Sequence, residues 1–191
     1  KYSTVPVING LSDFCHPCQV LADLMTIRER MTRLEGLKVC YIGDGNNMAN
    51  SIIVGCLKCG MDISVACPSD YSPHRTVLDF ASTVTDAKLT LTENVEEATA
   101  GADVLFTDVW ASMGQEKDAE TRRKAFRGYQ INAEVMALAA PGAIVQHCLP
   151  AHRGEEITDE VFEAYADAIF DEAENRLHAQ KAVMALLIGK K

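Results

Sequence analysis

The chain has 191 residues, a formal charge of −9 from 18 Lys and Arg against 27 Asp and Glu, and a hydrophobic content of 48%. These values are typical of a globular protein with one sizeable core, and no apolar run approaches the ~20 residues of a membrane span. Because nucleic-acid binding requires a basic face that releases counterions, we expect neither a nucleic-acid nor a membrane partner.

The N-terminal segment begins with a β-rich run at residues 5–9 and continues into a helix with Pro17 in an early position. Apolar residues then follow at helical spacing. We predict that residues 1–34 contain an isolated strand and a strut helix, the remnant of a second domain that this chain mostly lacks. We therefore expect the chain to be truncated at its N-terminus.

From residue 38 onward, short β-rich runs alternate with helical runs. The predicted strands are residues 38–42, 62–67, 88–92, 102–110, 143–149 and 168–171, and the predicted helices are residues 46–59, 73–84, 95–100, 133–139 and 159–165. This alternation predicts an α/β fold with an open, doubly wound parallel sheet, Rossmann-like, flanked by helices. We assign residues 35–170 to this domain and residues 171–191 to a second strut helix. The long irregular stretch at 111–130 is typical of a functional or mobile connection.

Seven cysteines lie in apolar stretches without the spacing of a secreted disulfide framework. They favour a reducing compartment, the cytoplasm, although a mitochondrial transit peptide would have preceded residue 1. Cys15-x-x-Cys18 and Cys56-x-x-Cys59 together have the spacing of a four-thiolate zinc site. Cys56 and Cys59 lie one turn apart in an apolar helix, however, which is more typical of core residues, and we expect no metal.

Ligands of open α/β sheets bind beyond the carboxyl ends of the strands, and the residues at those positions are polar. They are Gly43-Asp44-Gly45-Asn46-Asn47, Asp108 to Gly114, and His147-Cys148-Leu149-Pro150. Gly43-x-Gly45 lacks the third glycine of a dinucleotide motif, so a tight turn with helix-capping amides is the favoured interpretation. Cys148 either faces the crest of the sheet or is a buried cysteine at a strand end.

His16 and Gln19 lie three residues apart at a predicted helix N-terminus, so both side chains can face one ligand. Neutral donors at the positive end of a helix suit a polarised carbonyl or a phosphate oxygen, although simple helix capping is the alternative. Arg176 offers a guanidinium fork suited to phosphate, against the more common role of an arginine at a helix surface.

Three motifs together resemble ornithine carbamoyltransferases, of the aspartate/ornithine carbamoyltransferase superfamily. They are His16-Pro17-Cys18-Gln19, Asp108 with Ser112-Met113-Gly114, and His147-Cys148-Leu149-Pro150. The resemblance covers essentially the whole chain, as the C-terminal, ornithine-binding portion. It implies transfer of the carbamoyl group of carbamoyl phosphate to the δ-amine of L-ornithine, giving L-citrulline and phosphate in arginine or urea-cycle metabolism. It implies no metal or organic cofactor, and a homotrimer for the full-length enzyme.

The resemblance also implies residue roles. Carbamoyl phosphate would be bound by His16, Gln19, Cys148, Leu149 and Arg176. Ornithine would be bound by Asn47, Asp108, Ser112 and Met113, with Asn46 as a helper. The catalytic set would be His16, Asp108, Cys148 and Arg176, with the thiol positioning the amine rather than attacking. Residues 112–130 would close over ornithine as a lid.

Two related enzymes and one non-catalytic role are the alternatives. An aspartate carbamoyltransferase shares the His-Pro-x-Gln motif, and a putrescine enzyme can share His-Cys-Leu-Pro, but Ser112-Met113-Gly114 favours a substrate with an α-carboxylate. The family's Ser-Thr-Arg-Thr phosphate loop has no counterpart in this sequence. We therefore expect the chain alone to bind ornithine without full activity.

Overall fold

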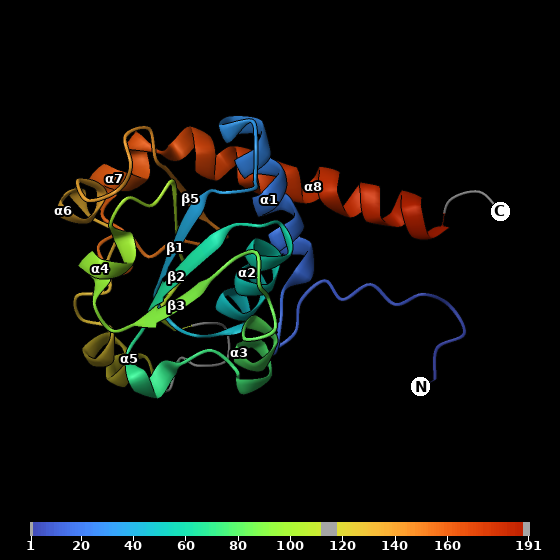
Figure 1. Cartoon of the computed structure of the whole chain (residues 1–191), viewed down its shortest axis with the longest axis horizontal. Helices are drawn as coiled ribbons and strands as arrows, with labels where there is room; N and C mark the ends of the chain where they lie inside the picture. Colours follow the sequence, from blue (N-terminus) through green and yellow to red (C-terminus); the bar gives the residue numbers. More distant parts are fainter. Residues whose placement is uncertain (1, 112–117, 189–191) are drawn as a thin grey trace.

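The computed structural model describes residues 2–111 and 118–188 of the chain (Figure 1). Its centre is one five-stranded parallel sheet in the order β3-β2-β1-β4-β5. The strands are β1 (Lys38–Ile42), β2 (Asp62–Ala66), β3 (Leu89–Thr92), β4 (Val104–Thr107) and β5 (Ile144–His147). All four pairs are parallel, which confirms the predicted doubly wound α/β fold.

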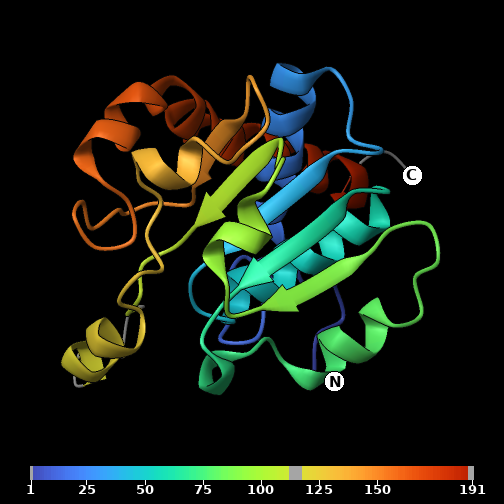
Figure 2. The same cartoon turned by 60° about the vertical axis from the view of Figure 1, so that its left-hand side comes forward.

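Helices cover both faces of the sheet (Figures 1 and 2). The helices of the described residues are α1 (Pro17–Met31), α2 (Asn47–Lys58), η1 (Ser69–Tyr71), α3 (Arg75–Ala81), α4 (Val95–Thr99), α5 (Ala119–Ala125), α6 (Ala133–Met136), α7 (Asp159–Ala164) and α8 (Ala166–Ile188). In the part of the chain that the structure describes, no helix combines the length and hydropathy that a membrane span requires.

The central strands are buried on both faces, so their sequences are almost continuously apolar. On β1, Val39 and Tyr41 pack into a core with α1 and α2, whereas Cys40 and Ile42 pack into a second core with α4, α6 and α7. This alternation follows from the two-residue period of a strand. Cys56, on α2, is fully buried in the first core, as its helical spacing predicts.

The strand order creates a crevice at the carboxyl ends of β1 and β4. The chain leaves β1 toward β2 and β3, then returns to the other side of β1 as β4 and continues to β5. The loops after β1 and β4 therefore diverge, and such a switch point is where open α/β sheets bind ligands.

The strut helices α1 and α8 pack against each other, and α8 also contacts β5 (Figure 1). Asn175 on α8 donates to Thr26 Oγ1 at 2.9 Å and to Glu29 Oε2 at 2.8 Å on α1. The α8 helix begins before the predicted boundary at residue 171. The predicted domain limits, at residues 1–34, 35–170 and 171–191, stay predictions.

Three predicted elements differ from the structure. Residues 5–9 form no strand, because a strand needs a hydrogen-bonded neighbour and none of the described residues pairs with them. Residues 168–171 are helical rather than a sixth strand, since a run of three apolar residues before Asp171 has no decisive period and the surrounding Ala, Glu and Leu favour a helix. The stretch at 111–130 contains α5.

Candidate active site

Asp108 lies at the switch point, directly after β4, and is only 7% exposed. Its Oδ1 accepts the Val109 N–H at 2.8 Å, and its Oδ2 accepts Asn46 Nδ2 at 2.9 Å. No ion pair reaches Asp108 from the described residues. A buried carboxylate held by neutral donors alone lacks a cationic partner, and a ligand ammonium group would supply one.

Cys148 follows β5 and is half-buried beside Asp108, so the structure favours the crest position over a fully buried strand-end cysteine. Its Sγ donates to Asp108 Oδ1 at 3.2 Å. Desolvation raises the pKa of the Cys148 thiol well above its usual range, and the negative charge of Asp108 adds to this effect. The thiol is therefore protonated at neutral pH and is a hydrogen-bond donor rather than a thiolate.

The turn after β5 is built on His147, whose side chain lies in the core with 0% exposure. Its Nδ1 accepts the Leu149 N–H at 2.9 Å, so the ring proton is on Nε2, which donates to Glu156 Oε1 at 3.2 Å. Leu149 has a left-handed backbone (φ 55°), a conformation that concentrates at functional turns. His147 thus supports the turn that presents Cys148 and Leu149.

His16, Gln19 and Arg176 meet between α1 and α8, as the sequence predicts. Arg176 Nη1 donates to Gln19 Oε1 and lies 3.4 Å from His16 Nε2. Burial lowers the pKa of His16, and the neighbouring Arg176 charge lowers it further, so the imidazole is neutral at pH 7. Arg176 Nε is buried and has no acceptor within the described ranges. The cluster therefore presents unsatisfied donor capacity suited to an anionic or polarised oxygen.

The loop after β1 places Asn46 and Asn47 differently. Asn46 Oδ1 caps α2 by accepting the N–H groups of Met48 and Ala49, while its Nδ2 reaches Asp108. This is the predicted capping role combined with a contact to the crest carboxylate. The Asn47 side chain donates to Ser12 O at 2.9 Å, so it ties the N-terminal segment to α2.

Gly45 explains the glycine pattern that resembles half a dinucleotide motif. A Cβ at Gly45 would lie 2.3 Å from Pro73 N and 2.4 Å from Tyr71 O. The Gly45 N–H also donates to Tyr71 O at 2.8 Å. The glycine therefore allows two backbone segments to approach closely. The close packing of the turn explains this glycine, and no bound pyrophosphate is needed to explain it.

Two buried pairs of charged or acidic residues near the site belong to no recognisable sequence motif. Asp44 forms an ion pair with Arg122 from α5, and Arg122 Nε also donates to Trp110 O. Asp23 and Glu172 lie behind Gln19. Their only sequence signals are an acid after a strand, at Asp44, and an acid one turn after Gln19 on a largely buried helix face.

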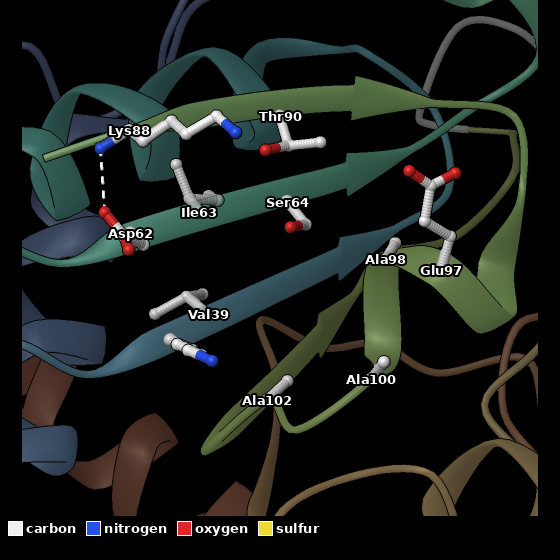
Figure 3. Close-up of a pocket in the computed structure, with 11 residues that line it drawn as sticks. Val39, Asp62, Ile63, Ser64, Lys88, Thr90, Glu97, Ala98, Ala100 and Ala102 are labelled. Atoms are coloured by element: carbon white, nitrogen blue, oxygen red, sulfur yellow. Dashed lines mark hydrogen bonds between the residues drawn. The ribbon is translucent and has the colours of Figure 1, made fainter.

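Ser112 and Met113, predicted to bind ornithine, lie outside the described residues. A hollow of about 260 Å³ lies elsewhere, on the sheet face over β1 to β3 beside α4 (Figure 3). It is lined by Val39, Ser64, Thr90 and Ala98 among others, and by none of the predicted site residues that the structure describes. The candidate site is therefore the open crest between α1, α8 and the carboxyl ends of β1, β4 and β5.

Comparison with known proteins identifies the same family that the motifs resemble. Residues 35–187 match the aspartate/ornithine carbamoyltransferase Asp/Orn binding domain, and residues 1–29 match the family's carbamoyl-P binding domain. The ornithine carbamoyltransferase of Geobacter metallireducens is 53% identical over 188 residues, 98% of this chain and 62% of the relative. That of Gloeobacter violaceus is 56% identical over 191 residues, 98% and 61% of the two chains.

Solved structures agree with the fold. The crystal structure of the Gloeobacter violaceus enzyme superposes with a TM-score of 0.90 at 53% identity, over 98% of this chain and 64% of that chain. The Pyrococcus furiosus enzyme superposes with a TM-score of 0.91 at 50% identity, over 100% and 62%. The chain thus spans about three-fifths of the length of its curated relatives. It belongs to the aspartate/ornithine carbamoyltransferase family and contains that family's Asp/Orn binding domain.

Proposed function

We propose that the full-length protein transfers the carbamoyl group of carbamoyl phosphate to the δ-amine of L-ornithine, giving L-citrulline and phosphate. The observation that carries this proposal is the pairing of two different subsites at one crest. A cationic and amide cluster of His16, Gln19 and Arg176 suits an anionic ligand that carries a carbonyl group. The buried Asp108, which has no ion-pair partner among residues 2–111 and 118–188, suits an amine. Asp108 also acts electrostatically on His16, so the two subsites are within reach of one another.

Ornithine is the proposed partner of the crest carboxylate. Asp108 holds a substrate ammonium group, with Asn46 and Cys148 fixing the carboxylate from either side at 2.9 and 3.2 Å. Asn47, together with Ser112 and Met113, completes the ornithine site by resemblance to the family. For Asn47 this requires release from Ser12, whose carbonyl its amide bonds in this structure.

Carbamoyl phosphate is the proposed ligand of the α1/α8 cluster. The carbonyl oxygen gains negative charge when an amine attacks, and donors of His16 and Arg176 would stabilise that charge. Gln19 accepts from Arg176 and so holds the guanidinium in place. His16 is neutral, so the cluster carries the positive charge on Arg176. Arg176 Nε, buried without an acceptor within the described ranges, is then the donor left for a substrate oxygen.

Cys148 acts as a positioning group in this proposal. A lysine-like amine has a pKa near ~10.4 in water and must be neutral to attack, so the site must orient it and favour its deprotonated form. Burial keeps the thiol protonated, which favours a hydrogen-bonding role over a covalent one. The Leu149 carbonyl lies beside it on the same turn.

For the assembly and compartment we propose a homotrimer of the full-length protein in the cytoplasm. The compartment is supported by seven free cysteines. The trimer rests on the family resemblance, and sedimentation equilibrium tests it. For the chain alone, we propose ornithine binding without full activity, because most of the family's carbamoyl-P domain is outside it.

The test of the function is a product assay on the full-length protein with carbamoyl phosphate and each of three amines. We expect citrulline from ornithine, and little carbamoylated product from aspartate or putrescine. Preferential carbamoylation of aspartate would assign the protein to the other branch of the family. Preferential carbamoylation of putrescine would show that no α-carboxylate is recognised.

A further inference from the structure

Two buried carboxyl groups lie directly behind Gln19. Asp23 follows Gln19 by one turn of α1, Glu172 lies on α8, and both are 0% exposed. The two hydrogens of Gln19 Nε2 go to Asp23 Oδ1 at 2.8 Å and to Glu172 Oε1 at 2.9 Å. Because both amide hydrogens are used there, the Gln19 carbonyl oxygen faces Arg176.

The donors around this pair do not satisfy all four carboxyl oxygens. Glu172 Oε2 accepts the His147 N–H at 2.8 Å, so both oxygens of Glu172 have an N–H donor. Asp23 Oδ2 is buried and receives no hydrogen bond from a donor group of the described residues. Both carboxyl groups accept from the same nitrogen, Gln19 Nε2, so they lie side by side in the core. Two ionised carboxylates there would repel each other out of water, and one oxygen would stay unsatisfied.

We propose that Asp23 and Glu172 share one proton at neutral pH, placed between Asp23 Oδ2 and the Glu172 carboxyl, and that this pair positions Gln19. The shared proton removes the repulsion and satisfies the remaining oxygen. Gln19 is then held in the one amide orientation whose oxygen accepts from Arg176. The inference deepens the proposed function and rests on it only for the identity of the substrate that Gln19 and Arg176 hold.

The electrostatic surroundings agree with a retained proton. Burial raises the pKa of Asp23 to about 7, and burial with repulsion by Asp23 raises the pKa of Glu172 well above its usual range. The other titratable groups that act on the pair are Arg176 on α8, Cys148 after β5 and Cys56 on α2. Burial raises the pKa of both thiols, so only Arg176 is charged, and it balances the single charge of the pair.

The donor pattern makes the two residues unequal toward substitution. Asp23→Asn replaces the protonated Oδ2 with an NH₂ group that still donates toward Glu172, and its oxygen still accepts from Gln19. Glu172→Gln places an NH₂ group against either Gln19 Nε2–H or the His147 N–H, so a donor meets a donor. We therefore expect Glu172→Gln to lower the urea midpoint of the chain more than Asp23→Asn does.

The test uses infrared spectroscopy of the 191-residue chain at pH 7, with Glu174→Gln, an exposed position on α8, as the matched control. We expect the carbonyl band of a protonated carboxylic acid in the wild type and in the control, and its loss in Asp23→Asn. The presence or absence of this band in the wild type shows, without any variant, whether the pair retains a proton. Its absence from the folded chain, or its persistence in Asp23→Asn, would overturn the shared proton.

Nuclear magnetic resonance of the Gln19 side-chain amide tests positioning. We expect slow hydrogen exchange of this amide in the wild type and in Asp23→Asn, and fast exchange in Asp23→Ala, so that the conservative variant rescues what the truncation loses. Equal exchange in the wild type and Asp23→Ala, or fast exchange in Asp23→Asn, would overturn the positioning role. A failed citrulline assay leaves both spectra as expected, so failure of the proposed function is distinguishable from failure of this inference.

Discussion

Replacing Arg122 with Met breaks the buried ion pair that ties α5 to the loop after β1. Both side chains are 10% exposed, and Asp44 has no other ion-pair partner within residues 2–111 and 118–188. Arg122 also donates to Trp110 O and lies over the Tyr71 and Phe126 rings at 4.9 and 5.4 Å. The substitution thus removes a charge partner, a backbone donor and two cation–π contacts together.

The expected loss is about 4 kcal/mol at pH 8, within the ~3 to 5 kcal/mol typical of breaking a buried pair from one side. Burial, although opposed by Arg122, raises the pKa of Asp44 to about 6, above its unfolded value of ~3.9. The folded state therefore binds this proton more tightly, and stability from this group is highest at low pH and falls as pH rises through about 6.

Without Arg122 the folded-state pKa of Asp44 rises further. Each additional pKa unit lowers the free energy of unfolding of the variant at high pH by about 1.4 kcal/mol. We therefore expect the difference in free energy of unfolding between the wild type and Arg122→Met to become smaller from pH 8 to pH 5. Urea unfolding followed by circular dichroism measures this difference. Asp44→Asn in the same chain should recover part of the loss. Lys124→Met, in an exposed pair on the same helix, is the control and should leave the midpoint unchanged. A loss below about 1 kcal/mol, or one independent of pH, would refute the buried-pair account.

Substitutions at three further positions test the crest. Asn46→Ala should cost about 1 kcal/mol in urea unfolding through loss of the α2 cap, and no change would contradict the capping role. Gly45→Ala should lower the urea midpoint, because its Cβ would lie 2.3 Å from Pro73 N, whereas Gly10→Ala has open space and should not; equal midpoints would contradict the close approach. In the full-length enzyme, Cys148→Ser should retain turnover with an altered ornithine KM, and Cys148→Ala should turn over more slowly than Cys148→Ser. Mass spectrometry of the wild type with carbamoyl phosphate alone tests the covalent alternative. A carbamoyl adduct on Cys148 that ornithine discharges would refute the role of the thiol in positioning the amine.

The sheet was predictable because its signals are local. The five strands have apolar or alternating runs whose period is visible without any partner, and a glycine lies within three residues before β1, β2, β4 and β5. The strand ends led directly to Asp108 and Cys148. The run at 168–171 was misassigned because its three apolar residues fit a strand and a helix equally well. The helix-forming residues around it and the packing of α8 on α1 decide for the helix.

The polar pairs behind the site were not predictable because they join distant segments. Arg122 and Asp44 are 78 residues apart, and Gln19 and Glu172 are 153 apart. An isolated acid such as Glu172, in a helix rich in charged residues, looks like a solvated surface group until the fold buries it. His16 and Gln19 were found from their spacing at a helix N-terminus and Arg176 from its guanidinium, and the family resemblance joined the three in one site.

Asp108 is the proposed anchor of ornithine, and replacing its carboxylate is the most direct test of the proposed function. Calorimetric titration of ornithine into the 191-residue chain should show binding that Asp108→Asn weakens by about 10- to 100-fold, since a charge-assisted hydrogen bond contributes ~1.5 to 3 kcal/mol. Asp79→Asn, in an exposed ion pair on α3, should bind ornithine as the wild type does. Equal ornithine affinity of the wild type and Asp108→Asn would contradict the account.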